Sequence, residues 1–169
     1  DVDGATTTDG ITNAGNFVTD GGTIKLDGSY PTGTGNTALG DTALDSIESG
    51  GNYNVAIGRN AATATTTGDN NIAIGNSSFD ANTTGSGNVA VGGDALGANT
   101  TASNNTAVGT SALLSNTTGT NNVAVGSLVL DANTTASGNT GMGYAALSSN
   151  TTGSANTAIG YGSLNANTT

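Results

Sequence analysis

The sequence of 169 residues contains no cysteine, no histidine and no tryptophan, and only one proline. Without cysteine the chain has no disulfide and no thiolate ligand for a metal, so cysteine usage leaves the redox compartment open. Without histidine it lacks the commonest general base and the commonest metal ligand. Any catalytic site would have to be built from Asp, Glu, Ser or Tyr.

Positive charge is nearly absent as well. Lys25 and Arg59 are the only cations, against 12 acidic residues, and the net charge is −10. Nucleic acid binding needs cationic groups that displace counterions, and anionic lipid surfaces also attract basic segments. No run of 18 apolar residues is present, which is the length that a membrane-spanning helix requires. We therefore expect no nucleic acid partner and no direct membrane insertion.

The chain is organised by a five-residue motif, Asn-x-Ala-aliphatic-Gly, that recurs eight times. The first step between motifs is 18 residues and every later step is 17. A fixed period of this kind predicts a solenoid, in which each repeat contacts only its neighbours. The motifs begin at Asn36, Asn54, Asn71, Asn88, Asn105, Asn122, Asn139 and Asn156.

Two regions follow from the period. Residues 1–35 do not share it, and short strand-like stretches separated by turn signals predict a small N-terminal β cap or connector. Residues 36–169 form the predicted eight-repeat solenoid, whose last repeat is incomplete. The chain therefore has the features of a piece of a longer protein.

Within each repeat, the motif predicts a strand whose second and fourth residues share one face, because strand side chains alternate. A short Ala-Leu segment follows and predicts a second strand, so that two short strands per turn stack in parallel in an all-β solenoid. We assign the interior to the fourth strand position and to the Leu of the second segment. These predicted core residues are Leu39, Ile57, Ile74, Val91, Val108, Val125, Met142, Ile159, Leu96, Leu113, Leu130, Leu147 and Leu164.

Two sets of polar residues also recur in register. The eight motif Asn residues are predicted to stack as an amide ladder along the solenoid axis. An Asn-Thr-Thr segment predicts a turn with possible surface contacts, and this interpretation is favoured over a role as a glycosylation acceptor. Its members are Asn82, Thr83, Thr84, Asn99, Thr100, Thr101, Asn116, Thr117, Thr118, Asn133, Thr134, Thr135, Asn150, Thr151 and Thr152.

The Asn-x-Ala-aliphatic-Gly motifs, each followed by a small-Leu step, resemble the head repeats of trimeric autotransporter adhesins, the YadA-like family. The longer form with Asn-Thr-Thr is similar to repeats in phage tail-fibre and other virion appendage proteins. The resemblance covers residues 36–169. It implies a left-handed parallel β-roll and three chains side by side in a rod. A thin roll with two apolar faces independently predicts a homo-oligomer, because one chain cannot bury both faces.

No residue stands out as catalytic, cofactor-binding or metal-binding. Asp41, Asp45, Asp80, Asp94 and Asp131 lie near the turns, but they do not recur at one repeat position as a calcium ladder would require. We therefore predict a non-enzymatic structural or adhesive fibre without a cofactor, located outside the cell as part of a virion or a cell surface. Its expected partners are its own copies, in a homotrimer, and a host-cell or extracellular surface receptor. The alternative is a surface-binding solenoid, such as an ice-binding protein that uses stacked Thr and Asn rows.

Overall fold

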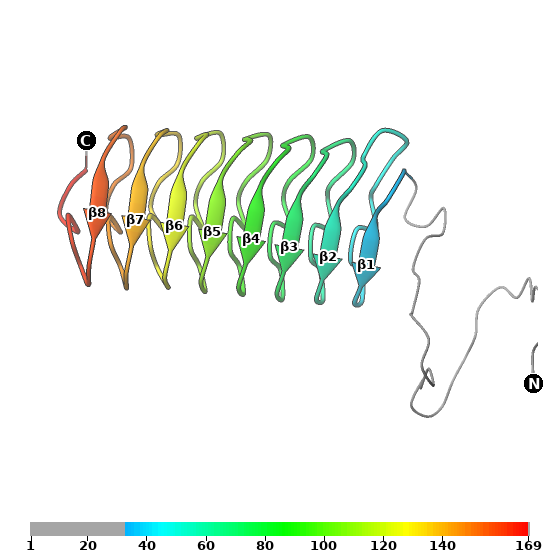
Figure 1. Cartoon of the computed structure of the whole chain (residues 1–169), viewed down its shortest axis with the longest axis horizontal. Coiled ribbons are helices and arrows are strands. Elements are labelled where there is room, and N and C mark those ends of the chain that lie inside the picture. Colours follow the sequence, from blue (N-terminus) through cyan, green and yellow to red (C-terminus); the bar gives the residue numbers. More distant parts are fainter. Residues whose placement is uncertain (1–32, 169) are drawn as a thin grey trace, which may run out of the picture.

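The computed structural model describes residues 33–168 and contains one sheet of eight parallel strands in sequence order. Each strand has three residues, and one turn of the solenoid leads from each strand to the next (Figure 1). The predicted N-terminal cap lies outside the described residues, apart from its last three. The strands are β1 (Thr37–Leu39), β2 (Val55–Ile57), β3 (Ile72–Ile74), β4 (Val89–Val91), β5 (Thr106–Val108), β6 (Val123–Val125), β7 (Thr140–Met142) and β8 (Thr157–Ile159).

The register of the sheet follows the sequence period, so the predicted β-solenoid with about 17 residues per turn is confirmed. Ala90 of β4 pairs with Ala73 of β3 and with Ala107 of β5, and the flanking residues pair in the same way. Adjacent strands in a sheet lie about 4.8 Å apart. Equivalent residues of successive turns therefore form columns that run along the solenoid.

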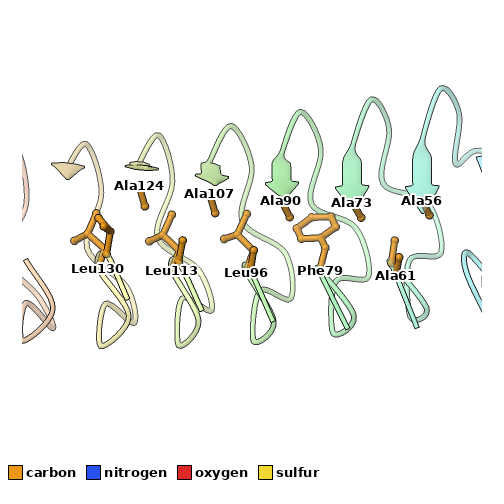
Figure 2. Close-up of a cluster of buried hydrophobic side chains, with 14 of the residues drawn as sticks. Ala56, Ala61, Ala73, Phe79, Ala90, Leu96, Ala107, Leu113, Ala124 and Leu130 are labelled. Atoms are coloured by element: carbon orange, nitrogen blue, oxygen red, sulfur yellow. The ribbon is translucent and has the colours of Figure 1, made fainter. Parts of the chain in front are cut away.

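The third position of the motif, which is the middle residue of each strand, faces the interior. The Ala side chains of this column point across the solenoid toward a second column that carries the large apolar residues (Figure 2). This second column contains four of the predicted core residues and two further large side chains, all fully buried. They are Leu96, Leu113, Leu130 and Leu147, together with Leu44 and Phe79.

The fourth position of the motif, which is the last residue of each strand, lies on the outside of the solenoid. The sequence analysis placed it in the interior. The interior is narrow and the Leu side chains of the opposite wall fill it, so the strand can turn only Ala or Gly inward. Leu164, in the last turn, is also exposed to 49%. The outward residues are Leu39, Ile57, Ile74, Val91, Val108, Val125, Met142 and Ile159.

The Ala-Leu segment forms a turn, not the second strand that the sequence predicts. Leu96, Leu113 and Leu130 have φ angles of 52°, 52° and 53°, in the left-handed region that a strand does not use. The segments still bond across turns, because the Leu96 N–H donates to the Ala112 carbonyl at 3.0 Å. Leu rarely adopts this conformation, and here its complete burial and the bonds between turns hold it there.

A column of glycines ends the strands. Gly92, Gly109 and Gly126 have φ angles of 134°, 136° and 129°, which side chains disfavour. A Cβ atom on Gly109 would lie 2.5 Å from the carbonyl carbon and oxygen of Gly126. Both the φ angle and the close approach of successive turns therefore require glycine at this position.

One departure from the repeat pattern is compensated by another. Gly141 replaces the inward Ala in β7, and Val129 replaces the Ala that precedes Leu in neighbouring repeats. A Cβ atom on Gly141 would lie 2.5 Å from Cγ1 of Val129. The missing methyl group at residue 141 thus makes room for the larger side chain at residue 129.

The 18-residue first step is absorbed in one loop. The Glu48 N–H donates to the carbonyl of Thr66, which is 18 residues later, at 2.8 Å. The Asn52 N–H donates to Oδ1 of Asp69, which is 17 residues later, at 2.6 Å. The extra residue therefore lies between Glu48 and Asn52, in a loop where Ser49 and Gly50 are exposed.

Candidate functional site

The motif Asn residues stack in one column, and their side chains join each turn to the next. The Asn122 N–H donates to Oδ1 of Asn105 at 2.9 Å, and the Asn139 N–H donates to Oδ1 of Asn122 at 2.9 Å. The same bond links every other pair of neighbours from Asn36 to Asn156. Nδ2 of Asn105 also donates to the Gly119 carbonyl, on the following turn, at 2.9 Å. One side chain thus pairs both a buried donor and a buried acceptor of the next turn.

The Asn of Asn-Thr-Thr forms a second buried column, which the sequence analysis missed. The Thr residues of the segment lie in a bend, in keeping with the predicted turn, but its Asn residues are not available for surface contacts. Nδ2 of Asn116 donates to Oδ1 of Asn99 at 3.2 Å and to the Gly119 carbonyl at 3.0 Å. The fully buried members are Asn82, Asn99, Asn116, Asn133 and Asn150.

The two Asn columns meet on one row of backbone carbonyls. The Gly119 oxygen accepts from Asn105 and from Asn116, and a carbonyl oxygen has two lone pairs for this purpose. The same double acceptance occurs at Gly85, Ala102, Ala136 and Gly153. This polar corner is therefore closed by the protein's own groups. It is a structural device and presents none of these amides to a ligand.

Replacing Asn122 with Leu is expected to destabilise the solenoid. The Asn139 N–H loses its acceptor, and an unpaired buried donor costs about 1–3 kcal/mol. Chemical denaturation monitored by circular dichroism measures the change in unfolding free energy. Asn121→Gly is the matched control, because Asn121 is exposed, has a φ angle of 59°, and is replaced by Gly at positions 87 and 138. Equal stability of the two variants would contradict a stabilising role for the ladder.

The two Thr residues of each Asn-Thr-Thr have different environments. The first donates its hydroxyl to the next turn: Oγ1 of Thr117 donates to the Thr134 carbonyl at 3.1 Å. The same bond is made by Thr83, Thr100, Thr134 and Thr151. The second Thr is exposed, at Thr84, Thr101, Thr118, Thr135 and Thr152. These second Thr residues therefore form a column of exposed Thr side chains.

Most of the exposed large apolar side chains lie on the outer sheet face, which we define as the first and last residues of each strand, β1–β8. Every residue at these positions is Thr, Val, Ile, Leu or Met. Ile72 and Ile74 are 38% and 36% exposed, and Met142 is 45% exposed. The face thus carries one apolar column along the whole described solenoid, at the last residue of each strand, and beside it a second column in which Thr is interspersed with Val and Ile. A contiguous exposed apolar surface of this kind marks an interaction site.

Two acidic groups titrate abnormally. Burial raises the pKa of Asp80, its backbone hydrogen bond lowers it, and the nearby charge of Asp94 raises it further, with a net upward shift. Burial likewise raises the pKa of Asp131 above its usual value. Oδ1 of Asp131 is buried and has no hydrogen-bond partner among the described residues. Folding therefore shifts the pKa of both carboxyl groups upward, toward the protonated form.

The solenoid is accordingly expected to gain stability from these two groups in acid. A folded-state pKa above the unfolded value means that the stabilising contribution is complete below the unfolded pKa. It is lost as the pH rises through the folded pKa. Unfolding free energies measured from about pH 4 to about pH 7, a range above the ordinary Asp pKa, test this sign. The variant Asp131→Asn should show a weaker pH dependence than the parent chain, and an unchanged dependence would contradict the role of Asp131.

Other kinds of site are absent from the described residues. Residues 33–168 have no pocket, and within that range no group of three or more acidic side chains is placed to hold a metal ion. Nor does this part of the chain include a helix long and apolar enough to span a membrane. Comparison of the chain with protein-family models, with curated proteins and with solved structures gives no match. The outer sheet face is therefore the candidate functional site.

Proposed function

We propose that the chain is a non-enzymatic segment of a fibre, in which three copies pack side by side as a rod. The observation that carries this proposal is the outer sheet face, in which one uninterrupted apolar column lies beside a mixed column of Thr, Val and Ile on the outside of a thin solenoid. A chain with a net charge of −10 has a use for an apolar face of this length only when something covers it.

Second copies of the chain are the covering that fits this face best. The face is straight and repeats in register with the turns, so an identical parallel chain presents a matching surface over its whole length. Burying one aliphatic side chain contributes roughly 1.5–3 kcal/mol, and each turn offers one or two. A ring of copies with closed cyclic symmetry buries the face on every copy. A dimer that pairs two such faces does so as well.

The number three and the left-handed sense of the roll come from the resemblance to YadA-like head repeats. In such an arrangement the outer sheet faces turn toward a common axis, and the polar Thr edges face solvent. Eight turns at about 4.8 Å give a rod segment on the order of 38 Å. The rod spaces or presents a host-binding or surface-binding element of a virion or a cell, outside the cell, and the receptor is its second partner. The high negative charge keeps neighbouring rods apart.

Light scattering on the purified chain tests the assembly. A mass of three times 16.1 kDa is expected for a trimer, at concentrations where the solenoid signal in circular dichroism is present. A folded monomer that unfolds in a sharp transition would contradict the proposal. A dimer would leave the covered face in place and refute the three-fold symmetry alone.

The alternative function, ice binding by stacked Thr rows, requires those Thr residues to lie on a flat extended surface. Thr100 and Thr101 lie in a bend, as do their equivalents in other repeats, and this favours the fibre. Thermal hysteresis of the purified protein separates the two functions: the fibre proposal expects none.

A further inference from the structure

The chain contains eight Asn-x-Ser/Thr acceptor sequences for N-linked glycosylation, and six of them are the Asn-Thr-Thr segments. Five of these six Asn side chains lie in the second buried column. We infer that N-glycosylation of these five Asn residues and folding of the solenoid exclude each other. The rod then forms only where these residues escape modification. This inference does not depend on the trimer.

The atom that glycosylation modifies is the atom that holds the column together. In the reaction, Nδ2 forms a bond to the anomeric carbon of a sugar, the bond from that carbon to a lipid pyrophosphate breaks, and Nδ2 loses one proton. Nδ2 of Asn116 uses both of its protons, toward Oδ1 of Asn99 and the Gly119 carbonyl. A glycosylated Asn116 keeps one proton and must give up one of these two bonds.

Space excludes the modification as firmly as hydrogen bonding does. Asn99, Asn116 and Asn133 are 0% exposed, and the Asn residues of successive turns lie about 4.8 Å apart along the column. A protein interior at normal packing density has no room for a sugar ring beside such a side chain. A glycan attached before folding must therefore keep the Asn outside, which opens the corner where both Asn columns bond to the carbonyl row.

The other two acceptor sequences behave differently. Asn76, in Asn76-Ser77-Ser78, and Asn104, in Asn104-Asn105-Thr106, are exposed. Asn104 precedes the ladder residue Asn105 but is not part of the column. A glycan at either position projects into solvent and leaves both columns intact, so these are the two acceptor sites that the fold tolerates.

The test compares the full chain made in a bacterial cytoplasm with the same chain carried into a eukaryotic secretory pathway. Protease treatment separates the folded fraction, and mass spectrometry measures occupancy at each acceptor Asn. Folded protein from the secretory pathway is expected to carry glycans at Asn76 and Asn104 and none at the five buried Asn residues. Occupancy at Asn99, Asn116 or Asn133 is expected only in the protease-sensitive fraction, with a loss of folded yield relative to the bacterial product.

Two matched variants connect the loss to the glycan. The first replaces the second Thr of all six segments with Ala, which removes the acceptor sequences and leaves the buried Asn in place. The second replaces the first Thr of the same segments with Ala, which keeps every acceptor sequence. Both are expected to fold in the bacterial cytoplasm, and only the first should recover the folded yield in the secretory pathway. The replaced residues are Thr84, Thr101, Thr118, Thr135, Thr152 and Thr169 in the first variant, and Thr83, Thr100, Thr117, Thr134, Thr151 and Thr168 in the second.

Three results would overturn the inference. The first is a protease-resistant fraction with glycans on the buried column. The second is a secretory yield that stays low when the acceptor sequences are removed, because the glycan would then not be the cause. The third is an absence of glycans from the Asn-Thr-Thr segments in all of the material, since modification would then not compete with folding.

Discussion

The variant Ala107→Asp is expected to abolish folding of the solenoid around β5. Ala107 is completely buried and points across the narrow interior toward the Leu column (Figure 2). A carboxylate there has no partner, and the penalty for burying an unpaired ion is several kcal/mol, a large part of the roughly 5–15 kcal/mol that stabilises a typical domain. Circular dichroism and protease resistance report the loss of structure.

The adjacent residue provides the control and tests the proposed assembly at the same time. Val108 lies on the outer sheet face and is 36% exposed, so Val108→Asp is expected to leave the solenoid folded and to reduce the assembly to monomers. Thr118→Asp, in the exposed Thr column, should change neither property. Light scattering together with circular dichroism distinguishes the three variants. A folded Ala107→Asp variant would refute the inward orientation of the third position, and an intact oligomer with Asp at 108 would refute the interface.

Gly109→Ala is the second substitution with a large expected effect. The new Cβ would lie 2.5 Å from the Gly126 backbone, and Ala would have to adopt a φ angle of 136°. Backbone strain of about 1–3 kcal/mol and overpacking of about 1–3 kcal/mol together predict a loss of roughly 2–6 kcal/mol. Thermal and chemical unfolding measure the loss.

A second glycine with a positive φ angle serves as the control. Gly138 has a φ angle of 72°, and a Cβ atom there would meet nothing closer than 4.0 Å. Asn occupies the equivalent position in other repeats, at Asn70, Asn104 and Asn121, where the φ angles are 58°, 61° and 59°. Gly138→Asn should therefore change the unfolding free energy by no more than about 0.5 kcal/mol. If both glycine variants lost equal stability, the close approach of the glycine column would not be the cause.

Sequence periodicity predicts the stacking of the solenoid but not which strand face is inside. Alternation assigns the second and fourth positions to one face and the third to the other, and it says nothing more. Choosing the larger side chains for the interior fails here because the opposite wall already supplies Leu96, Leu113 and their equivalents. A usable signal was the near-constancy of the third position, which is Ala in seven of eight repeats, while the fourth varies among Leu, Ile, Val and Met.

The two Asn columns show a similar limit. The first was predictable because its Asn directly precedes each strand. The second has equal regularity from Asn82 onward, but turn chemistry alone explains an Asn before Thr, so the sequence gives no sign that this Asn is buried. The left-handed Leu residues carry no sequence signal, since Leu disfavours that conformation and tertiary packing imposes it. Gly141 becomes intelligible only beside Val129, a contact that no repeat alignment within the chain would reveal.

Because the polar corners from Asn82 onward are closed by equivalent groups of neighbouring turns, these repeats have equivalent polar contacts. When recombination duplicates or deletes one of these repeats in the coding sequence, each Asn, Gly and Ala stacks on its equivalent in the new neighbouring turn. The Asn side-chain hydrogen bonds between turns are therefore kept. The one extra residue of the first repeat is accommodated in the loop between Glu48 and Asn52, where the Gly51 carbonyl still accepts from Nδ2 of Asn36 at 2.8 Å. Evolution can therefore change the length of the solenoid through the number of repeats, in increments of about 4.8 Å, without selecting a new fold.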